Sequence, residues 1–174
     1  MKRIICWVAL LFLITDTTAQ KRKKPVDHIP FPTAEYDTLP AINTGQSSIK
    51  GEAFFVSSWA QVRKAVGTNV YLFRVTSYTK HWFDVSVLGN KNMTAGDDRQ
   101  KKCNIYTTSN SEGKFEFNQV PHGNYYLFLW FYWDEPQYNV YGRITGTKRF
   151  GGLLYKVITV DGSSAYNYVL TNQQ

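Results

Sequence analysis

The sequence predicts an all-β protein built from two packed antiparallel sheets, and three observations support this fold class. From Ile49 onward, short apolar and aromatic runs alternate with turn residues, and no window carries a helical period long enough to define a helix. Clusters of Gly, Pro, Asn, Asp and Ser separate these runs at the short intervals typical of tight turns. Aromatic residues make up 16% of the chain. One sheet could not bury so much aromatic surface, so two sheets are expected to pack face to face.

The start of the chain has the pattern of a cleavable signal peptide. Lys2 and Arg3 precede an apolar run of 11 residues, Ile4 to Ile14, and Thr17-Thr18-Ala19 follows. A membrane-spanning helix needs roughly 18 or more apolar residues, so a retained anchor is the less favoured alternative. We therefore expect cleavage after Ala19, no transmembrane anchor after cleavage, and export to the periplasm, the cell surface or the extracellular space.

Cleavage of residues 1–19 from the chain of 174 leaves 155 residues, the size of one domain. Residues 20–48 contain four of the six prolines and no helical or strand periodicity, which predicts an extended, disordered lead. The net charge after cleavage is +6, and Lys21-Arg22-Lys23-Lys24 supplies four of these charges. This basic start can rest on an anionic surface or remain a solvated tail. The folded part is nearly balanced in charge, so a nucleic-acid role is not expected.

Residues 49–172 are expected to form the domain, with seven strands. The predicted strands are Lys50 to Ser57, Asn69 to Thr76, Asn104 to Thr108, Lys114 to Asn118, Asn124 to Trp133, Leu153 to Asp161 and Tyr166 to Thr171. Turns are indicated at residues 109–113, 121–123 and 161–163.

One stretch, residues 103–127, carries a recognisable signature. It reads as a strand, a polar turn ending in Gly, Phe-x-Phe and then Val-Pro-x-Gly-x-Tyr. Gly suits a turn with positive φ, and alternate Phe rings lie on one face of a strand. The signature residues are Gly113, Phe115, Phe117, Pro121, Gly123 and Tyr125.

This stretch resembles the core of carboxypeptidase regulatory-like domains. More of the chain, from about residue 49 to 172, is similar to small exported bacterial proteins made of this module alone; Gly51-Glu52-Ala53-Phe54 fits their early strand. The resemblance implies a seven-stranded antiparallel β-sandwich of the transthyretin-like (prealbumin-like) type. It implies almost nothing about activity, because such modules serve structural, binding and assembly roles.

The aromatic run from Tyr125 to Trp133 is the most unusual feature of the domain. If Tyr125 points inward, strand alternation turns every second residue outward. The candidate binding face comprises Tyr126, Phe128, Trp130, Tyr132, Trp133, Asp134 and Glu135.

Three explanations for this aromatic, apolar face remain open. Two insertions, Ser77 to Gln100 and Asp134 to Phe150, carry aromatic residues that can cover it. It can be a docking surface for a protein partner, because Trp and Tyr dominate interface anchors. It can also stack sugar rings, with Asp134 and Glu135 orienting the hydroxyl groups.

Catalytic and metal-binding patterns are not found. The three histidines, His28, His81 and His122, show no metal or triad spacing, and Asp97-Asp98 lacks the spacing of a calcium loop. Transthyretin-like hydroxyisourate hydrolases resemble one another in a Tyr-Arg-Gly-Ser tail that this chain lacks. We therefore expect no enzyme activity, no cofactor and no metal.

Cysteine usage adds one more alternative. Cys6 leaves with the signal peptide, so Cys103 has no disulfide partner within the chain. The adjacent Lys101 and Lys102 can lower its thiol pKa and make it reactive, but a small buried strand residue is the simpler interpretation.

The sequence thus predicts a non-catalytic exported structural or interaction module, of bacterial origin, that docks an envelope or extracellular protein. The alternative is an extracellular carbohydrate-binding module that uses exposed Trp and Tyr. A third, less favoured alternative is an adhesin-like domain with a Lys–Asn cross-link, for which Lys50, Glu116 and Asn172 are the nearest analogues.

Overall fold

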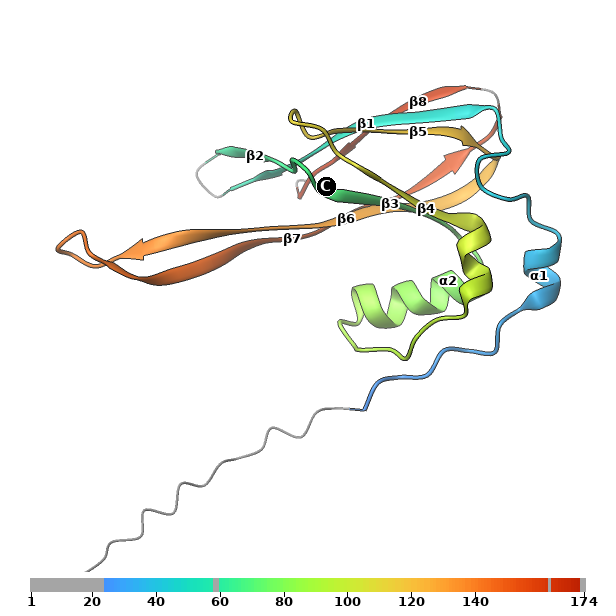
Figure 1. Cartoon of the computed structure of the whole chain (residues 1–174), viewed down its shortest axis with the longest axis horizontal. Helices are drawn as coiled ribbons and strands as arrows, with labels where there is room; N and C mark the ends of the chain where they lie inside the picture. The colour runs from blue at the N-terminus through green and yellow to red at the C-terminus, as the bar shows by residue number, and fades with distance from the viewer. Residues whose placement is uncertain (1–23, 58–59, 163, 173–174) are drawn as a thin grey trace, which may run out of the picture.

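The protein folds into two four-stranded sheets packed against each other (Figure 1). The computed structural model describes residues 24–57, 60–162 and 164–172, so the signal peptide expected over residues 1–19 lies outside the described residues. The first sheet contains β2 (Val62–Lys64), β1 (Ser47–Val56), β5 (Lys114–Val120) and β8 (Ala165–Leu170). The second contains β4 (Asn104–Thr108), β3 (Asn69–Arg74), β6 (Gly123–Tyr138) and β7 (Ile144–Val160).

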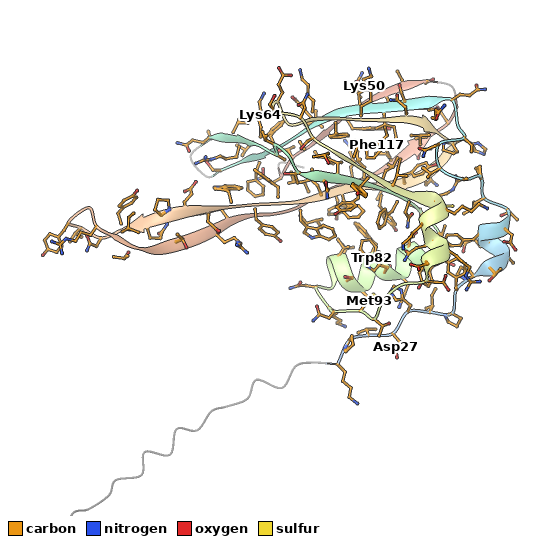
Figure 2. The ribbon with its side chains drawn as sticks, in the orientation of Figure 1. Asp27, Lys50, Lys64, Trp82, Met93 and Phe117 are labelled. Atoms are coloured by element: carbon orange, nitrogen blue, oxygen red, sulfur yellow. The ribbon has the colours of Figure 1, made fainter. Side chains whose placement is uncertain are left out.

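The hydrophobic core lies between the two sheets. Ile49, Phe115 and Phe117 project from the first sheet, and Leu127 and Leu129 from the second. Figure 2 shows Phe117 in this space. Each strand contributes alternate residues, as expected for sheets that bury one face. The predicted all-β, two-sheet architecture is therefore confirmed.

One strand pairing differs from the expected antiparallel arrangement. β1 and β8 pair in parallel, from Ser48 opposite Ala165 to Ala53 opposite Leu170, whereas the other pairings are antiparallel. The two strands are far apart in sequence, so no tight hairpin turn fixes their relative direction. The prediction of a purely antiparallel sandwich is wrong at this position.

Among the described residues there is one strand more than predicted, and β6 and β7 are much longer than expected. β2 is only three residues long and fully exposed, so it has no apolar alternation that would reveal it. The sequence suggested an insertion at residues 134–150, and one of the three explanations has it folding over the sheet. These residues instead extend β6 and β7 into a two-stranded ribbon that projects beyond the other strands (Figure 1). We call residues 130–152 the arm.

The other insertion folds as helical turns. It forms α2 (Ser77–Trp82), which continues into the wider helical turn η1 (Phe83–Leu88), and the 3₁₀ turn η2 (Asp98–Cys103) follows. Thr76 caps α2: its side chain accepts from the Thr79 backbone N–H, and the Thr79 side chain accepts from the Thr76 N–H. In the described part of the chain, no helix has the length and apolar character needed to cross a membrane.

The prediction of a disordered lead is wrong for residues 24–48. This segment forms the short helix α1 (Thr33–Asp37), and its last two residues begin β1. Tyr36 is buried with Tyr78 and Cys103, and its hydroxyl lies 3.0 Å from Thr76 Oγ1. Prolines need no amide partner, so a proline-rich segment can pack without secondary structure when aromatic residues anchor it. The composition shows that the segment is rich in proline, but it does not show that Tyr36 is buried and holds the segment in place.

Candidate binding groove

The signature residues occupy the positions that their chemistry suggested. Gly113 has φ +75° and Gly123 φ +146°, both in the region that favours glycine. Phe115 and Phe117 lie in the core with ring centroids 6.1 Å apart. The Tyr125 hydroxyl donates to the Pro121 carbonyl at 2.8 Å and closes the turn between them.

The candidate binding face is not one continuous exposed surface, because Tyr126 and Phe128 are buried. The Phe83 ring stacks on Tyr126 at 4.1 Å, and Trp82 lies 5.7 Å from Phe128. Tyr126 and Phe128 are therefore covered by the helical insertion, as the first of the three explanations proposed. Burial also raises the pKa of Tyr126.

Trp130 and Tyr132 remain open, with 38% and 52% of their surfaces exposed. The second insertion does not cover them, because it forms the arm. The Trp130 ring contacts Phe128 at 5.2 Å and Tyr71 at 6.0 Å. This ring therefore continues the aromatic surface that begins under the helix.

Trp133 and Glu135 lie on the opposite side of the ribbon. Trp133 packs against Phe55 and Phe150, at 5.4 and 5.9 Å, and donates from Nε1 to Glu135 at 2.8 Å. Glu135 also binds Arg63 at 2.9 Å. Strand alternation explains this: position 133 shares its face with Tyr125, so the grouping of Trp133 and Glu135 with Trp130 is wrong.

Asp134 lies on the outer side but is also occupied. Its carboxylate binds its cross-strand neighbour Arg149 at 3.1 Å, and this guanidinium lowers the pKa of the Asp134 carboxyl. The two acids expected to orient a sugar therefore bind arginines instead.

A groove that the sequence did not reveal opens beside the buried part of this face. Its volume is about 610 Å³. Its aromatic wall consists of Tyr71 and Phe73 from β3, Tyr106 from β4 and Trp82 from α2. Trp82 lies on the side of the helix that faces the sheet (Figure 2). We call this site the aromatic groove.

Strand register brings these rings together. Tyr71 lies opposite Tyr106 on one side and opposite Phe128 on the other, with ring centroids 5.9 and 5.2 Å away. The Phe73 ring contacts Trp82 at 5.4 Å. The alternation of Tyr71 and Phe73 was visible in the sequence, but the register that places Tyr71 beside Tyr106 and Phe128 was not.

Polar side chains line the rest of the groove. They are His28, Thr94, Gln100, Lys101 and Asn104, and Gly96 and Ile105 complete the lining. None of the lining residues is Asp or Glu. The groove is therefore an aromatic wall faced by amide, hydroxyl and basic groups.

His28 connects the lead to this site. Its ring stacks on Tyr78 at 4.8 Å, and its Nε2 lies 3.1 Å from the Thr94 carbonyl oxygen. Its Nδ1 is buried with no hydrogen-bond partner among the described residues. A buried polar atom of this kind normally has a hydrogen-bond partner, and here it belongs to a residue that lines the groove.

The η2 turn that holds Gln100 and Lys101 is fixed by an arginine clamp. Arg99 binds the Asp97 carboxylate through Nε and a terminal nitrogen, at 2.9 and 2.7 Å, and lies 4.1 Å above the Phe31 ring. The hydrogen bonds from Arg99 hold the pKa of Asp97 at about 2. Asp98 binds Lys101. These two acids form ion pairs on a loop that borders the groove.

The arrangement has the features of a site for a small ligand. Aromatic faces and amide groups are the usual elements of a small-ligand site, in which a few polar groups fix orientation. Within the described ranges, no group of three or more His, Cys, Asp and Glu side chains is placed to hold a metal ion. Of the other histidines, His122 lies in the turn before β6, where its carbonyl accepts from Arg74, and His81 is near the Asp27 carbonyl.

Cys103 is a packing residue. It is buried with Tyr36 and Tyr78, and its Sγ lies 3.8 Å from the Pro40 carbonyl oxygen. Burial raises the pKa of the thiol, in the direction opposite to that of an activated cysteine.

The residues considered for a cross-link do not meet. Lys50 and Glu116 form an exposed ion pair at 3.3 Å between β1 and β5. Asn172 lies toward the other end of β1, where its side chain binds the Val56 backbone N–H and carbonyl at 2.7 and 2.9 Å. The three side chains therefore cannot act together.

The fold is similar to that of proteins with solved structures. No protein-family model and no curated protein matches the chain. The crystal structure of a "putative carbohydrate binding protein" from Pseudomonas aeruginosa is similar, with a TM-score of 0.68 and 25% sequence identity over 84% of this chain and 100% of that one. The major pilin subunit of Bacillus cereus also matches, over 74% of this chain and 31% of that one, with 11% identity and a TM-score of 0.31.

Proposed function

We propose that this chain is a non-catalytic, exported bacterial module that binds carbohydrate in the aromatic groove. The proposal includes the carboxypeptidase regulatory-like type of sandwich that the sequence resembles. The groove that carries it combines Tyr71, Phe73, Trp82 and Tyr106 with amide side chains. The similar Pseudomonas protein supports the same class of ligand.

Sugar rings have an apolar face and a hydroxyl edge, and the groove offers a counterpart for each. The rings of Tyr71 and Tyr106 supply flat apolar surface for the sugar face. Gln100 and Asn104 carry side-chain amides that can bind hydroxyl groups. The Asn104 Oδ1 already accepts the Arg74 backbone N–H at 3.2 Å, so its amide nitrogen is the group offered to the ligand.

A glycan array read with matched variants tests the proposal. Tyr106 and Tyr138 are similarly exposed, at 64% and 61%, but only Tyr106 lies in the groove. We expect Tyr106→Ala to weaken binding about tenfold or more, which corresponds to the loss of about 1.4 kcal/mol of contact. We expect Tyr138→Ala to bind like the wild type. Absence of any glycan binding, or equal loss in both variants, would contradict the proposal.

Docking to an envelope protein is the second candidate, and the exposure of Trp130 and Tyr132 favours it. These two rings share the outer side of β6 but do not line the groove. If this surface is the functional one, Trp130→Ala should abolish a cross-link formed to a partner in the native envelope, while Tyr106→Ala leaves it intact. The reverse result would exclude this candidate.

A further inference from the structure

The arm ends in an exposed apolar tip that the glycan proposal does not use. β3 leaves β6 after Phe128, but the pairing of β6 with β7 continues as far as Tyr138 opposite Ile144. The exposed apolar side chains at this end are Tyr138, Val140, Tyr141 and Ile144, and Val140 is 93% exposed. Four such side chains together at the end of a projecting ribbon are unusual for a surface that faces only water.

The tip is a structured turn. The Asn139 side-chain oxygen accepts from the backbone N–H groups of Tyr141 and Arg143 at 2.9 and 3.0 Å. The Asn139 N–H donates to the Arg143 carbonyl at 3.0 Å, and Gly142 takes φ +73°. This turn holds Val140 and Tyr141 outward in a defined geometry.

The arm carries more basic than acidic side chains, and its two acids, Asp134 and Glu135, form ion pairs with Arg149 and Arg63. From Pro136 to Val160 the sequence has no Asp or Glu, but it has Arg143, Lys148, Arg149 and Lys156. Arg149 is neutralised by Asp134, whereas Arg143 and Lys148 have no carboxylate partner among the described residues. Lys148 Nζ lies 5.1 Å from the Phe150 ring, so its stem packs along the ribbon.

We propose that the tip of the arm docks on the surface of an anionic lipid bilayer. Tyrosines favour the interface between water and lipid, and small apolar side chains beside them enter the acyl boundary. Cations just behind such a tip attract anionic headgroups. A protein partner fits less well, because a stable protein interface buries about 800 Å² on each side, far more than one narrow hairpin turn offers.

This inference is independent of the aromatic groove. The groove is lined by residues of β3, β4, α2, the lead and the segment 94–101, none of which belongs to the arm. Docking by the arm therefore leaves the groove free to bind its own ligand.

Co-sedimentation with lipid vesicles tests the proposal. We expect the protein to bind vesicles of phosphatidylcholine mixed with phosphatidylglycerol, not vesicles of phosphatidylcholine alone, and to bind less at high salt. The Val140→Ser/Tyr141→Ser variant should lose binding about tenfold or more. At low salt, Arg143→Gln and Lys148→Gln should each lose about fivefold.

The control variant carries Val62→Ser and Val66→Ser, two changes to apolar residues outside the arm that are also exposed, at 56% and 50%. It should bind vesicles like the wild type. The basic tract near residue 21 can add binding of its own, so the decisive result is the difference between the tip variant and the wild type. Binding unchanged by the tip substitutions, or equal loss in the control, would overturn the proposal. A dimer that dissociates when the tip is changed, measured by light scattering, would assign the tip to a second copy of the chain instead.

Discussion

Arg74 shows how individual contacts build the turn ahead of β6. This arginine is buried, yet its partners are neutral oxygens: the Tyr125 hydroxyl at 3.3 Å and the His122 carbonyl at 2.9 Å. Its guanidinium also lies 5.6 Å from the centre of the Tyr125 ring. A Cβ atom at Gly123 would lie 2.7 Å from the same guanidinium. The turn therefore requires glycine at 123 both for its φ angle and for the space.

We predict that Gly123→Ala lowers the free energy of unfolding by about 1–3 kcal/mol, because it adds backbone strain and a clash with Arg74. Gly152→Ala is the matched control in β7, where nothing lies within 4 Å of an added Cβ. It should stay within about 1 kcal/mol of the wild type. Urea denaturation measures both. Equal destabilisation would show that the space around Gly123 is not the constraint.

Cys103 gives a second prediction at this scale. Because burial raises the pKa of its thiol, the reactive thiolate is scarce in the folded protein at pH 8. We expect the native thiol to react with a disulfide reagent much more slowly than the same thiol in urea. As the pH rises toward the raised pKa, the native reaction should accelerate. A native rate equal to the unfolded rate at pH 8 would restore the reactive interpretation.

The described part of the lead packs against the helical insertion and is hydrogen-bonded to it. The Glu35 carboxylate accepts the Ser77 backbone N–H at 3.0 Å, at the first residue of α2. Tyr36 enters the pocket formed with Tyr78 and Cys103. Residue 26 pairs with the loop after η1, where the Val26 N–H donates to the Asn92 carbonyl at 2.8 Å. The lead thus holds in place the loops that line one side of the groove.

We predict that Tyr36→Ala destabilises the protein by about 3–5 kcal/mol, the usual cost of removing a large buried aromatic side chain. Tyr138→Ala, on the exposed tip, should change stability by less than about 0.5 kcal/mol. Thermal unfolding compares the two variants, and limited proteolysis should show faster cleavage of the lead in Tyr36→Ala. A lead that was disordered would leave both variants with the same stability.

At the scale of the whole molecule, the sandwich supports two features at different places. The aromatic groove collects residues from the lead, from two strands and from α2. The arm extends only β6 and β7 and projects past the other strands (Figure 1). If the groove binds carbohydrate and the tip of the arm docks on a bilayer, as proposed, the molecule would hold a glycan near a membrane surface.

The sequence predicted what depends on local periodicity. The bounds of β4 match, and the alternation along β6 correctly placed Tyr125, Leu127 and Leu129 in the core. It failed where structure depends on distant partners. The direction of β8, the register that joins Tyr71 to Tyr106 and the burial of Tyr36 all arise from contacts across long sequence separations. The six residues of α2 are also too few to show a helical period.

The most direct test of the central claim is a nitrogen–proton NMR titration with the oligosaccharide that binds best on the array. Trp82 lines the groove, whereas Trp133 packs between Phe55 and Phe150 on the other side of the ribbon. Each indole N–H gives its own signal. We predict that the Trp82 signal shifts with added sugar and that the Trp133 signal stays in place. A shift of Trp133 with Trp82 unchanged would contradict binding in the aromatic groove.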